Sequence, residues 1–185
     1  MATPIGHSLA GYALYRAMEP YGIKHRALLA VFMAIAPDLD FVPGFLIGTP
    51  ALYHQSVSHS VGFALVISVA VALIYRRKQQ SFFAIFSLCF VAYLSHLIID
   101  FFGPDGRVPY GQPLFWPASN TYFISPVSVF WGMHHAGSTD GSRSEWMMGV
   151  FSLYNMGAVA VEIGLIMPFV FLGKFYRRIF ASPAA

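Results

Sequence analysis

The stretch FFAIFSLCFVAYLSHLIIDFF, residues 82–102, is almost entirely apolar until a histidine and an aspartate occur near its end. A helix that crosses a bilayer needs about 20 mostly apolar residues, which this stretch supplies. His96 and Asp100 are four positions apart, so a helix presents both side chains on one face. The stretch therefore predicts a membrane-spanning helix that carries two polar groups near one end.

Three further apolar runs, residues 27–48, 61–75 and 147–173, are predicted to span the membrane in the same way. The shorter run 5–18 fits a short fifth span, a re-entrant helix or an interfacial helix. We therefore expect an all-α fold, a polytopic membrane bundle of four strong spans plus this N-terminal helix. Residues 1–185 are expected to form a single integral membrane domain, with residues 103–146 as a long outer loop.

The composition supports a membrane protein. Of the 185 residues, 57% are hydrophobic and only 10% are charged, whereas an ordinary soluble domain has about a quarter charged residues. These values exclude a disordered chain and argue against a soluble enzyme. The single cysteine, Cys89, excludes an intramolecular disulfide framework and a CxxC metal or redox site. The net charge of +3 comes from a few local clusters, so we expect the lipid bilayer as a partner and no nucleic acid.

The basic residues predict the orientation of the spans, because lysine and arginine are enriched in cytoplasmic loops. Three clusters occupy alternate connections: Lys24, His25 and Arg26; Arg76, Arg77 and Lys78; and Lys174, Arg177 and Arg178. The two other connections carry only Arg107 and Arg143. We therefore expect the clusters in the cytoplasm and the two arginine-poor connections outside.

Four of the eight acids, Asp38, Asp40, Asp100 and Glu162, fall within or at the end of apolar runs. A charged side chain at the centre of a membrane helix costs about 2.5–3.5 kcal/mol, so such residues usually face a partner or a cavity. The basic clusters lie at the other end of the predicted spans. A divalent metal ion is therefore the simplest source of the positive charge that these acids need.

Three local patterns place further metal-binding side chains near these acids. His96 and Asp100 share a helix face, and Pro37 is expected to break the helix, so that Asp38 and Asp40 point to one side of an extended segment. His54 and His59 precede the run 61–75, and His7 lies near the N-terminus. The predicted metal ligands are His7, Asp38, Asp40, His54, His59, His96 and Asp100.

Mixed imidazole and carboxylate ligands suit zinc, with manganese or iron as alternatives, and such a site can polarise a phosphoryl or acyl oxygen. An acid that is not a ligand is available as a general base, so Asp38, Asp40 and His54 are candidate catalytic residues. Arg107 or Arg143 is expected to orient an anionic substrate group.

Other interpretations of the same residues remain open. A membrane histidine is often a packing residue, and Asp38 or Asp40 can cap a helix. Glu162 has three open roles: it completes the site, pairs with an arginine or is protonated. His134 and His135 are more readily explained as a surface pair, and His25 as a residue facing lipid headgroups.

The ordered motifs resemble a known family. They are His7, Pro37-Asp38-Leu39-Asp40, the stretch from His54 to Ser60, the stretch from Ser95 to Asp100, and the stretch from Gly111 to Pro117. Together they look like the YdjM-like, LexA-binding, inner-membrane-associated family of predicted membrane-bound metal-dependent hydrolases. That family is in turn distantly similar to zinc-dependent phospholipase C.

The resemblance implies an inner-membrane location, phosphoester chemistry, and metal ligation by His7, Asp38 or Asp40, His59, His96 and Asp100. The chain departs from the family in two places. The family commonly has His-Arg-Gly before its Thr-His-Ser, and Gln55, Ser56 and Ser58 stand in these places here. No histidine precedes Glu162 by four residues. The second departure favours one or two metal ions over three.

Three functions follow as hypotheses. The preferred one is a membrane-bound metal-dependent hydrolase, acting at the outer face on a phosphoester or lipid substrate. The second is an ion or solute transporter that uses the intramembrane acids and histidines, although the sequence lacks the paired halves of many transporters. The third is a non-catalytic membrane scaffold. For it, the sequence identifies no protein partner beyond the LexA association in the family's name.

Overall fold

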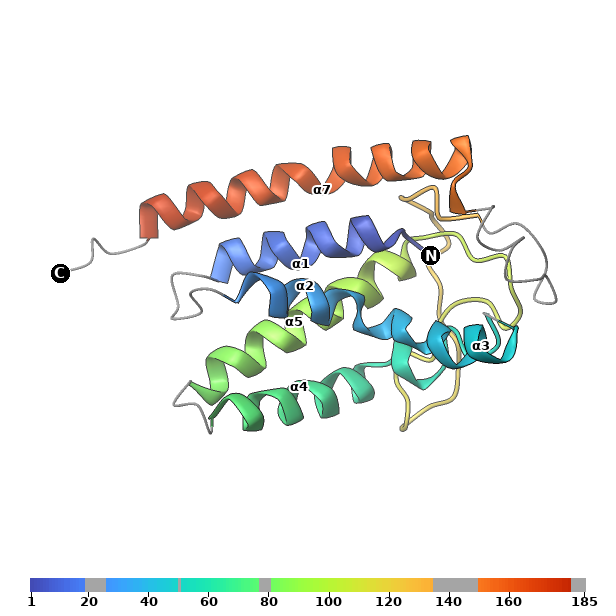
Figure 1. Ribbon diagram of the computed structural model, residues 1–185, viewed down its shortest axis with the longest axis horizontal. Helices are drawn as coiled ribbons and strands as arrows, with labels where there is room; N and C mark the ends of the chain where they lie inside the picture. Colours follow the sequence, from blue (N-terminus) through green and yellow to red (C-terminus); the bar gives the residue numbers. More distant parts are fainter. Residues whose placement is uncertain (19–25, 50, 77–80, 135–149, 181–185) are drawn as a thin grey trace.

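The computed structural model describes residues 1–18, 26–49, 51–76, 81–134 and 150–180. Its elements are α1 (Pro4–Met18), α2 (Ala27–Ile35), η2 (Ala36–Asp40), α3 (Phe41–Ile47), η3 (Val57–His59), α4 (Val61–Arg76), α5 (Phe82–Phe101) and α7 (Leu153–Phe180) (Figure 1). The described residues contain no β-strand, only an isolated bridge between Gln112 and Phe123. The expectation of a helical fold is confirmed.

Three of the predicted spans are long and apolar enough to cross a membrane: Ala27–Ile47, Phe82–Phe101 and Leu153–Gly173. The fourth predicted span forms α4, which is apolar but has only 16 residues. At 1.5 Å per residue such a helix is about 24 Å long, less than the roughly 30 Å of a bilayer's hydrocarbon core. The short N-terminal run is helical as well, as the 15 residues of α1.

The predicted extended segment at Asp38 and Asp40 is wrong, because residues 36–40 form the 3-10 helix η2. Pro37 lies in the first turn of η2, where its missing N–H and fixed φ are compatible with a helix. Pro43 likewise lies in the first turn of α3. The prolines therefore divide this span into three helical pieces instead of straightening it.

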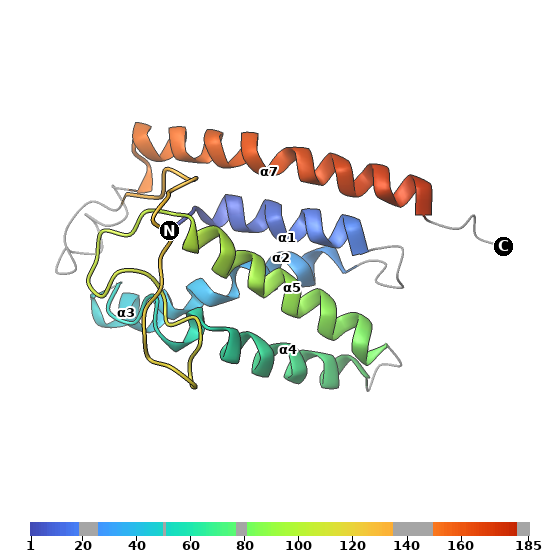
Figure 2. The same ribbon diagram turned by 180° about the vertical axis from the view of Figure 1, so that it is seen from behind.

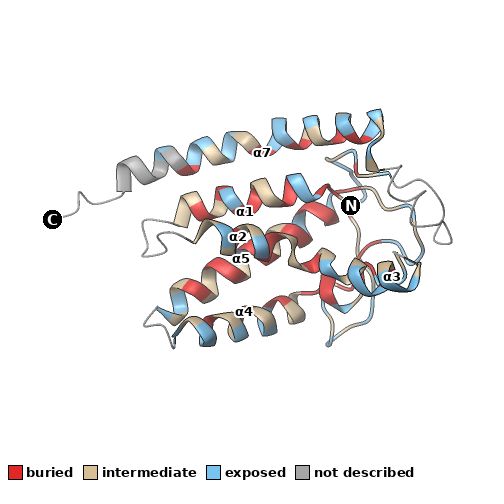
Figure 3. Ribbon diagram, viewed as in Figure 1, coloured by how far each residue is buried: buried red, intermediate tan, exposed pale blue. Residues whose placement is uncertain are grey.

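Helix α5 lies at the centre of the bundle, in contact with α1, α2 and α4, and much of its surface is buried (Figure 3). Helix α7 lies at one side and packs mainly on α1 (Figure 2). Small residues permit close approach between α1 and α2, since a Cβ on Gly11 would lie 2.7 Å from the Ala30 carbonyl oxygen. The core includes Met33, Leu88 and Tyr93.

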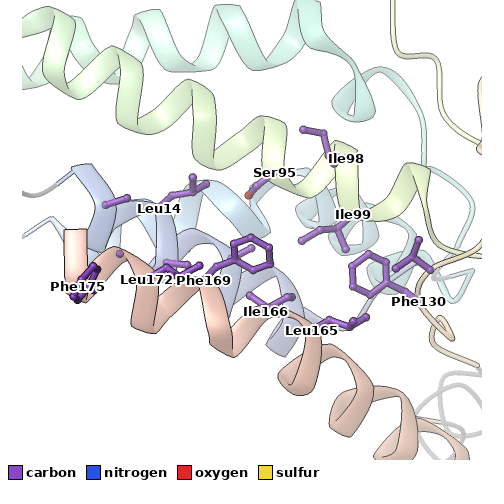
Figure 4. A pocket seen from close by; sticks show the side chains of 15 residues that line it. Leu14, Ser95, Ile98, Ile99, Phe130, Leu165, Ile166, Phe169, Leu172 and Phe175 are labelled. Atoms are coloured by element: carbon purple, nitrogen blue, oxygen red, sulfur yellow. The ribbon is translucent and has the colours of Figure 1, made fainter. Parts of the chain in front are cut away.

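A groove of about 930 Å³ separates α7 from α5, with α1 as its floor (Figure 4). Ile99, Phe130 and Phe169 are among its lining residues, and Ser95 is the only polar one. The groove contains no titratable side chain. This groove is therefore apolar and separate from the polar groups described below.

The two ends of the bundle differ in charge. The N-terminus, α3 and the described part of the long loop, residues 103–134, gather at one end (Figure 1). The C-terminal ends of α1 and α4 and the N-terminal end of α2 lie at the other end, where Arg16, Arg76 and Arg26 are found. Lys24, His25, Arg77 and Lys78 lie outside the described residues, as do the side chains of Lys174, Arg177 and Arg178.

Candidate metal centre

Four predicted ligands, Asp38, His59, His96 and Asp100, come together near the loop end of the bundle. Asp38 comes from η2, His59 from η3, and the other two from α5. The two histidines are fully buried and Asp100 is 4% exposed. These four residues, which we call the inner group, can hold a metal ion.

Five distances between ligand atoms of the inner group are close to those in a tetrahedral metal site. His96 Nε2 lies 3.3 Å from His59 Nε2 and 3.3 Å from Asp100 Oδ2. Asp38 Oδ1 lies 3.5 Å from His96 Nε2 and 3.7 Å from His59 Nε2, and His59 Nε2 lies 3.8 Å from Asp100 Oδ2. Ligand atoms placed tetrahedrally at about 2.0–2.1 Å from a zinc ion are roughly 3.3–3.4 Å apart. These five distances are thus within a few tenths of an ångström of this spacing, and all four ligand atoms lie within 4.8 Å of one another.

Hydrogen bonds on the far edges of both imidazoles orient them toward the centre. His96 Nδ1 lies 2.8 Å from the Ala34 carbonyl oxygen. His59 Nδ1 lies 3.1 Å from the Ser58 hydroxyl, which donates its hydrogen to Asp40, and 3.2 Å from Asp40 Oδ2. These partners act as acceptors, so each Nδ1 carries a hydrogen and each neutral ring keeps its lone pair on Nε2. Two lone pairs 3.3 Å apart repel unless a cation lies between them. Outer acceptors of this kind are typical of metal-bound histidines.

The carboxylates of the inner group also lack donors. Both oxygens of Asp38 and the Oδ2 of Asp100 are buried without a hydrogen-bond partner among the described residues. A buried carboxylate without partners is costly, and polar groups of this kind are nearly always satisfied in native proteins. Two of these three oxygens, Asp38 Oδ1 and Asp100 Oδ2, are ligand atoms of the inner group. A metal ion between them would satisfy both.

The raised pKa of His59 also indicates that the inner group needs positive charge. Burial by itself lowers the pKa of His59, but the carboxylates of Asp38 and Asp40 outweigh burial and raise its pKa to about 9. Without a metal, the ring therefore holds a second proton at neutral pH. The centre requires one cation, either a proton or a metal ion.

Asp40 and His54, two further predicted ligands, form an outer pair next to the inner group, and together with His59 they make a second set of side chains that could hold a metal ion. Asp40 Oδ1 lies 2.9 Å from His54 Nδ1, and Asp40 Oδ2 accepts hydrogen bonds from the Ser58 hydroxyl at 2.7 Å and the Gln55 N–H at 3.1 Å. Burial lowers the pKa of His54 despite its bond to Asp40, and its ring stacks on Phe41. The Nε2 of His54 faces the Met1 sulfur. Asp38 and Asp40 both reach His59, but from opposite edges of the ring.

His7 lies on the other side of the inner group. Its ring stacks on His96 with centroids 3.7 Å apart, and its Nε2 lies 3.3 Å from Asp100 Oδ1. Neither ring nitrogen has a hydrogen-bond partner among the described residues. His7 is thus next to the carboxylate oxygen that points away from the inner group.

The other predicted residues that the structure describes lie outside the inner group. The Arg107 guanidinium donates to the backbone carbonyls of Ala51 and His54. His134 stacks on Tyr154, with ring centroids 3.9 Å apart, near the start of α7. His135 and Arg143 lie outside the described residues. Glu162 is fully buried and accepts hydrogen bonds from the Thr3 N–H at 2.8 Å and from the Thr3 hydroxyl, so it does not join the inner group.

Two supporting residues were not identified from the sequence. The Tyr93 hydroxyl donates to the Ser58 carbonyl oxygen at 2.6 Å, which ties the segment before α4 to α5. Ser58 also bonds to Asp40. Helical spacing offered a signal for Tyr93, which precedes His96 by three positions and Asp100 by seven and so shares their face. No local pattern signals the role of Ser58.

The fold and the inner group define a class: a helical membrane protein whose buried histidines and aspartates can hold a metal ion. The chain belongs to the YdjM family, since the family model described as YdjM inner membrane protein matches residues 1–178. The family and the three apolar helices support a location in the inner membrane. No curated protein and no solved structure matches the chain. Hydrolase activity and similarity to phospholipase C stay predictions.

Proposed function

We propose that this protein is a membrane-bound metal-dependent hydrolase with zinc in the inner group, acting on a phosphoester or lipid substrate. The observation that carries the proposal is the convergence, within 4.8 Å of one another, of two imidazole nitrogens and two donor-free carboxylate oxygens. Two neutral imidazoles and two carboxylates match the charge of a divalent ion. Nitrogen and oxygen donors in this geometry suit zinc better than calcium or magnesium, which prefer six or more oxygen ligands.

The residues around the inner group have distinct roles in this proposal. A bound zinc ion supplies Lewis-acid chemistry toward a phosphoryl or acyl oxygen. Asp40 holds the Nδ1–H of His59 and so fixes the direction of its Nε2. His54 donates its Nδ1–H to Asp40, which leaves a lone pair on Nε2 as a proton acceptor. Asp40 and His54 thus act as an oriented pair for proton transfer.

The orientation of the chain completes the proposal. The inner group lies at the end of the bundle opposite Arg16, Arg26 and Arg76, and basic residues favour the cytoplasmic side. We therefore assign the inner group to the outer half of the inner membrane, with α4 as a fourth, short span. A helix shorter than the bilayer core is accommodated by local thinning of the bilayer.

The test is elemental analysis of the detergent-purified protein together with hydrolysis of bis(p-nitrophenyl) phosphate. Wild-type protein is expected to hold zinc in stoichiometric amount, and His96→Ala to lose both zinc and turnover. His134→Ala is the matched control, because this histidine lies outside the inner group and should leave both readouts unchanged. Folded, metal-free wild-type protein contradicts the proposal. If such protein also transports ions into liposomes and Asp38→Asn stops the transport, the transporter hypothesis replaces it.

A further inference from the structure

A second cavity lies beside the metal centre, between residues 49–56 and the long loop. Its volume is about 420 Å³, within the usual range of small-molecule sites. Arg107, Thr49 and Tyr122 line it together with His54 and Gln55. His54 and Gln55 also hydrogen-bond to Asp40, so the cavity shares a wall with the shell of the metal centre.

Arg107 presents an unneutralised positive charge to this cavity. Its guanidinium is fixed by carbonyl oxygens: it donates to Ala51 and, at 3.0 Å, to His54. Asp105, the nearest acid in sequence, accepts the backbone N–H groups of Arg107 and Gly111 instead. No carboxylate in the described parts of the chain forms an ion pair with Arg107. Carbonyl dipoles orient the guanidinium but leave its charge available to an anion.

Two further features are typical of a binding site. The Thr49 hydroxyl is buried without a hydrogen-bond partner among the described residues. Gln55 has a φ of +59°, which is uncommon outside glycine, and its backbone N–H and side-chain oxygen contact Asp40 and Arg107. Such backbone strain is found most often at functional sites, where the surrounding contacts hold it.

From these contacts we infer that the cavity binds an oxyanion of the substrate, such as a phosphate group, through Arg107 and the Thr49 hydroxyl. The inference rests on the proposed hydrolase function and supplies its substrate-recognition site. Arginine suits this role because its planar set of N–H donors matches the oxygens of phosphate. The Thr49 hydroxyl gains the partner that it lacks. The anion then lies next to His54, the proposed proton acceptor.

The test measures binding of inorganic phosphate to zinc-loaded protein in detergent by isothermal titration calorimetry, with zinc content determined in parallel. Arg107→Gln is expected to weaken phosphate binding at least about tenfold and to leave the zinc content unchanged. Arg26→Gln is the matched control, since Arg26 lies over the Tyr75 ring at the other end of the bundle. Its phosphate affinity should equal that of the wild type.

Thr49→Val gives a second measurement that does not disturb the contacts of Arg107. Because the Thr49 hydroxyl has no partner in the described structure, its removal should leave folding intact and weaken phosphate binding about two- to tenfold. Zinc-loaded protein that binds no phosphate, or binds it equally in wild type, Arg107→Gln and Thr49→Val, overturns the inference and leaves the metal centre standing. Absence of zinc from folded wild-type protein overturns the hydrolase itself and with it the substrate role of the cavity.

Phosphate binding in nanodiscs of two lipid compositions distinguishes a lipid headgroup from a soluble phosphoester as the source of the anion. If the ligand is a lipid headgroup, phosphatidic acid in the nanodisc competes for Arg107 and lowers the apparent affinity for inorganic phosphate relative to phosphatidylcholine nanodiscs. If the ligand is a soluble phosphoester, both nanodiscs give the same affinity. Either result, together with the loss in Arg107→Gln, supports the cavity as the oxyanion site.

Discussion

Buried carboxylates occur in two regions of this protein, and their surroundings differ. At the junction of α1 and α7, Glu162 is fully buried but accepts hydrogen bonds from the backbone N–H and the hydroxyl of Thr3, at the start of α1. At the junction of α5 with η2 and η3, both oxygens of Asp38 and one of Asp100 have no donor in the described structure. The first carboxylate is stabilised by the N-terminal end of a helix, which favours negative charge. The second region requires a cation.

The two regions show that the burial of an acid does not by itself indicate metal binding. Glu162 and Asp38 both lie in apolar runs of the sequence, so the low charge content of these runs does not distinguish the two acids. The two acids differ in the number of N–H and O–H groups within hydrogen-bond distance of each carboxylate. An acid that has its donors within the protein holds two helices together, and an acid without donors is available to a metal ion.

The largest expected effect comes from replacing one carboxylate with an amide in each region. Asp38→Asn should weaken zinc binding by at least about 100-fold, because it removes a ligand charge from the inner group. Glu162→Gln should leave the zinc content unchanged, because Glu162 lies outside that group. Competition with a chelator, followed by elemental analysis, measures both. Equal zinc retention in the two variants would remove the distinction between the regions.

A smaller loss is expected from Asp40→Asn. Asp40 does not contact the proposed ion but accepts the Nδ1–H of His59 and so orients this ligand. Changes to such outer partners typically weaken metal binding by about 10- to 100-fold. The chelator competition should therefore place Asp40→Asn between wild type and Asp38→Asn. A loss as large as that of Asp38→Asn would instead make Asp40 a direct ligand.

Acidification should weaken zinc binding by about tenfold per pH unit. The pKa of His59 is raised to about 9, so below that pH the metal must displace one proton from this ring. The affinity accordingly rises from pH 6 to pH 9 and levels off above it. In Asp40→Asn one of the carboxylates that raise the pKa is gone, so the levelling should begin at a lower pH. Affinity that is independent of pH between 6 and 8 contradicts a His59 ligand.

The smallest effect concerns stability and not metal. A Cβ on Gly6 would lie 2.5 Å from Glu162 Oε2 and 2.9 Å from its Cδ, so Gly6→Ala forces this carboxylate away from α1. We expect a loss of about 1–3 kcal/mol, seen as a lower midpoint of thermal unfolding in detergent, with normal zinc content. Gly164→Ala is the control on α7, because its Cβ meets no atom within 4 Å. Zinc loss in Gly6→Ala would show that the position of Glu162 affects metal binding by the inner group.

Some of the fold and the site could be predicted because the information is local. The start of α5 at Phe82 and its end at Phe101 follow the apolar run almost to the residue. His96 and Asp100 were predicted to share a face, and both have an atom in the inner group. Four positions along a helix fix this relation before any tertiary contact forms.

Other parts could not be predicted, since they depend on packing. The two prolines near Asp38 suggested an extended segment, but both occupy first turns of helices. The direction of Asp38 and Asp40 therefore depends on how η2 lies against His59. Arg107 was expected to orient an anionic substrate group, but the sequence did not indicate that the backbone carbonyls of Ala51 and His54 fix its guanidinium.

The amino-acid sequence by itself determined that this chain is a helical membrane protein and that α5 presents His96 and Asp100 on one face, because apolar length and helical periodicity are properties of neighbouring residues. Only the tertiary structure decided which acids lack donors. Glu162 finds its donors at Thr3, 159 positions away, and Asp38 finds none in the described structure. Donors reach a buried carboxylate through the packing of distant segments, and no pattern along the chain encodes their number.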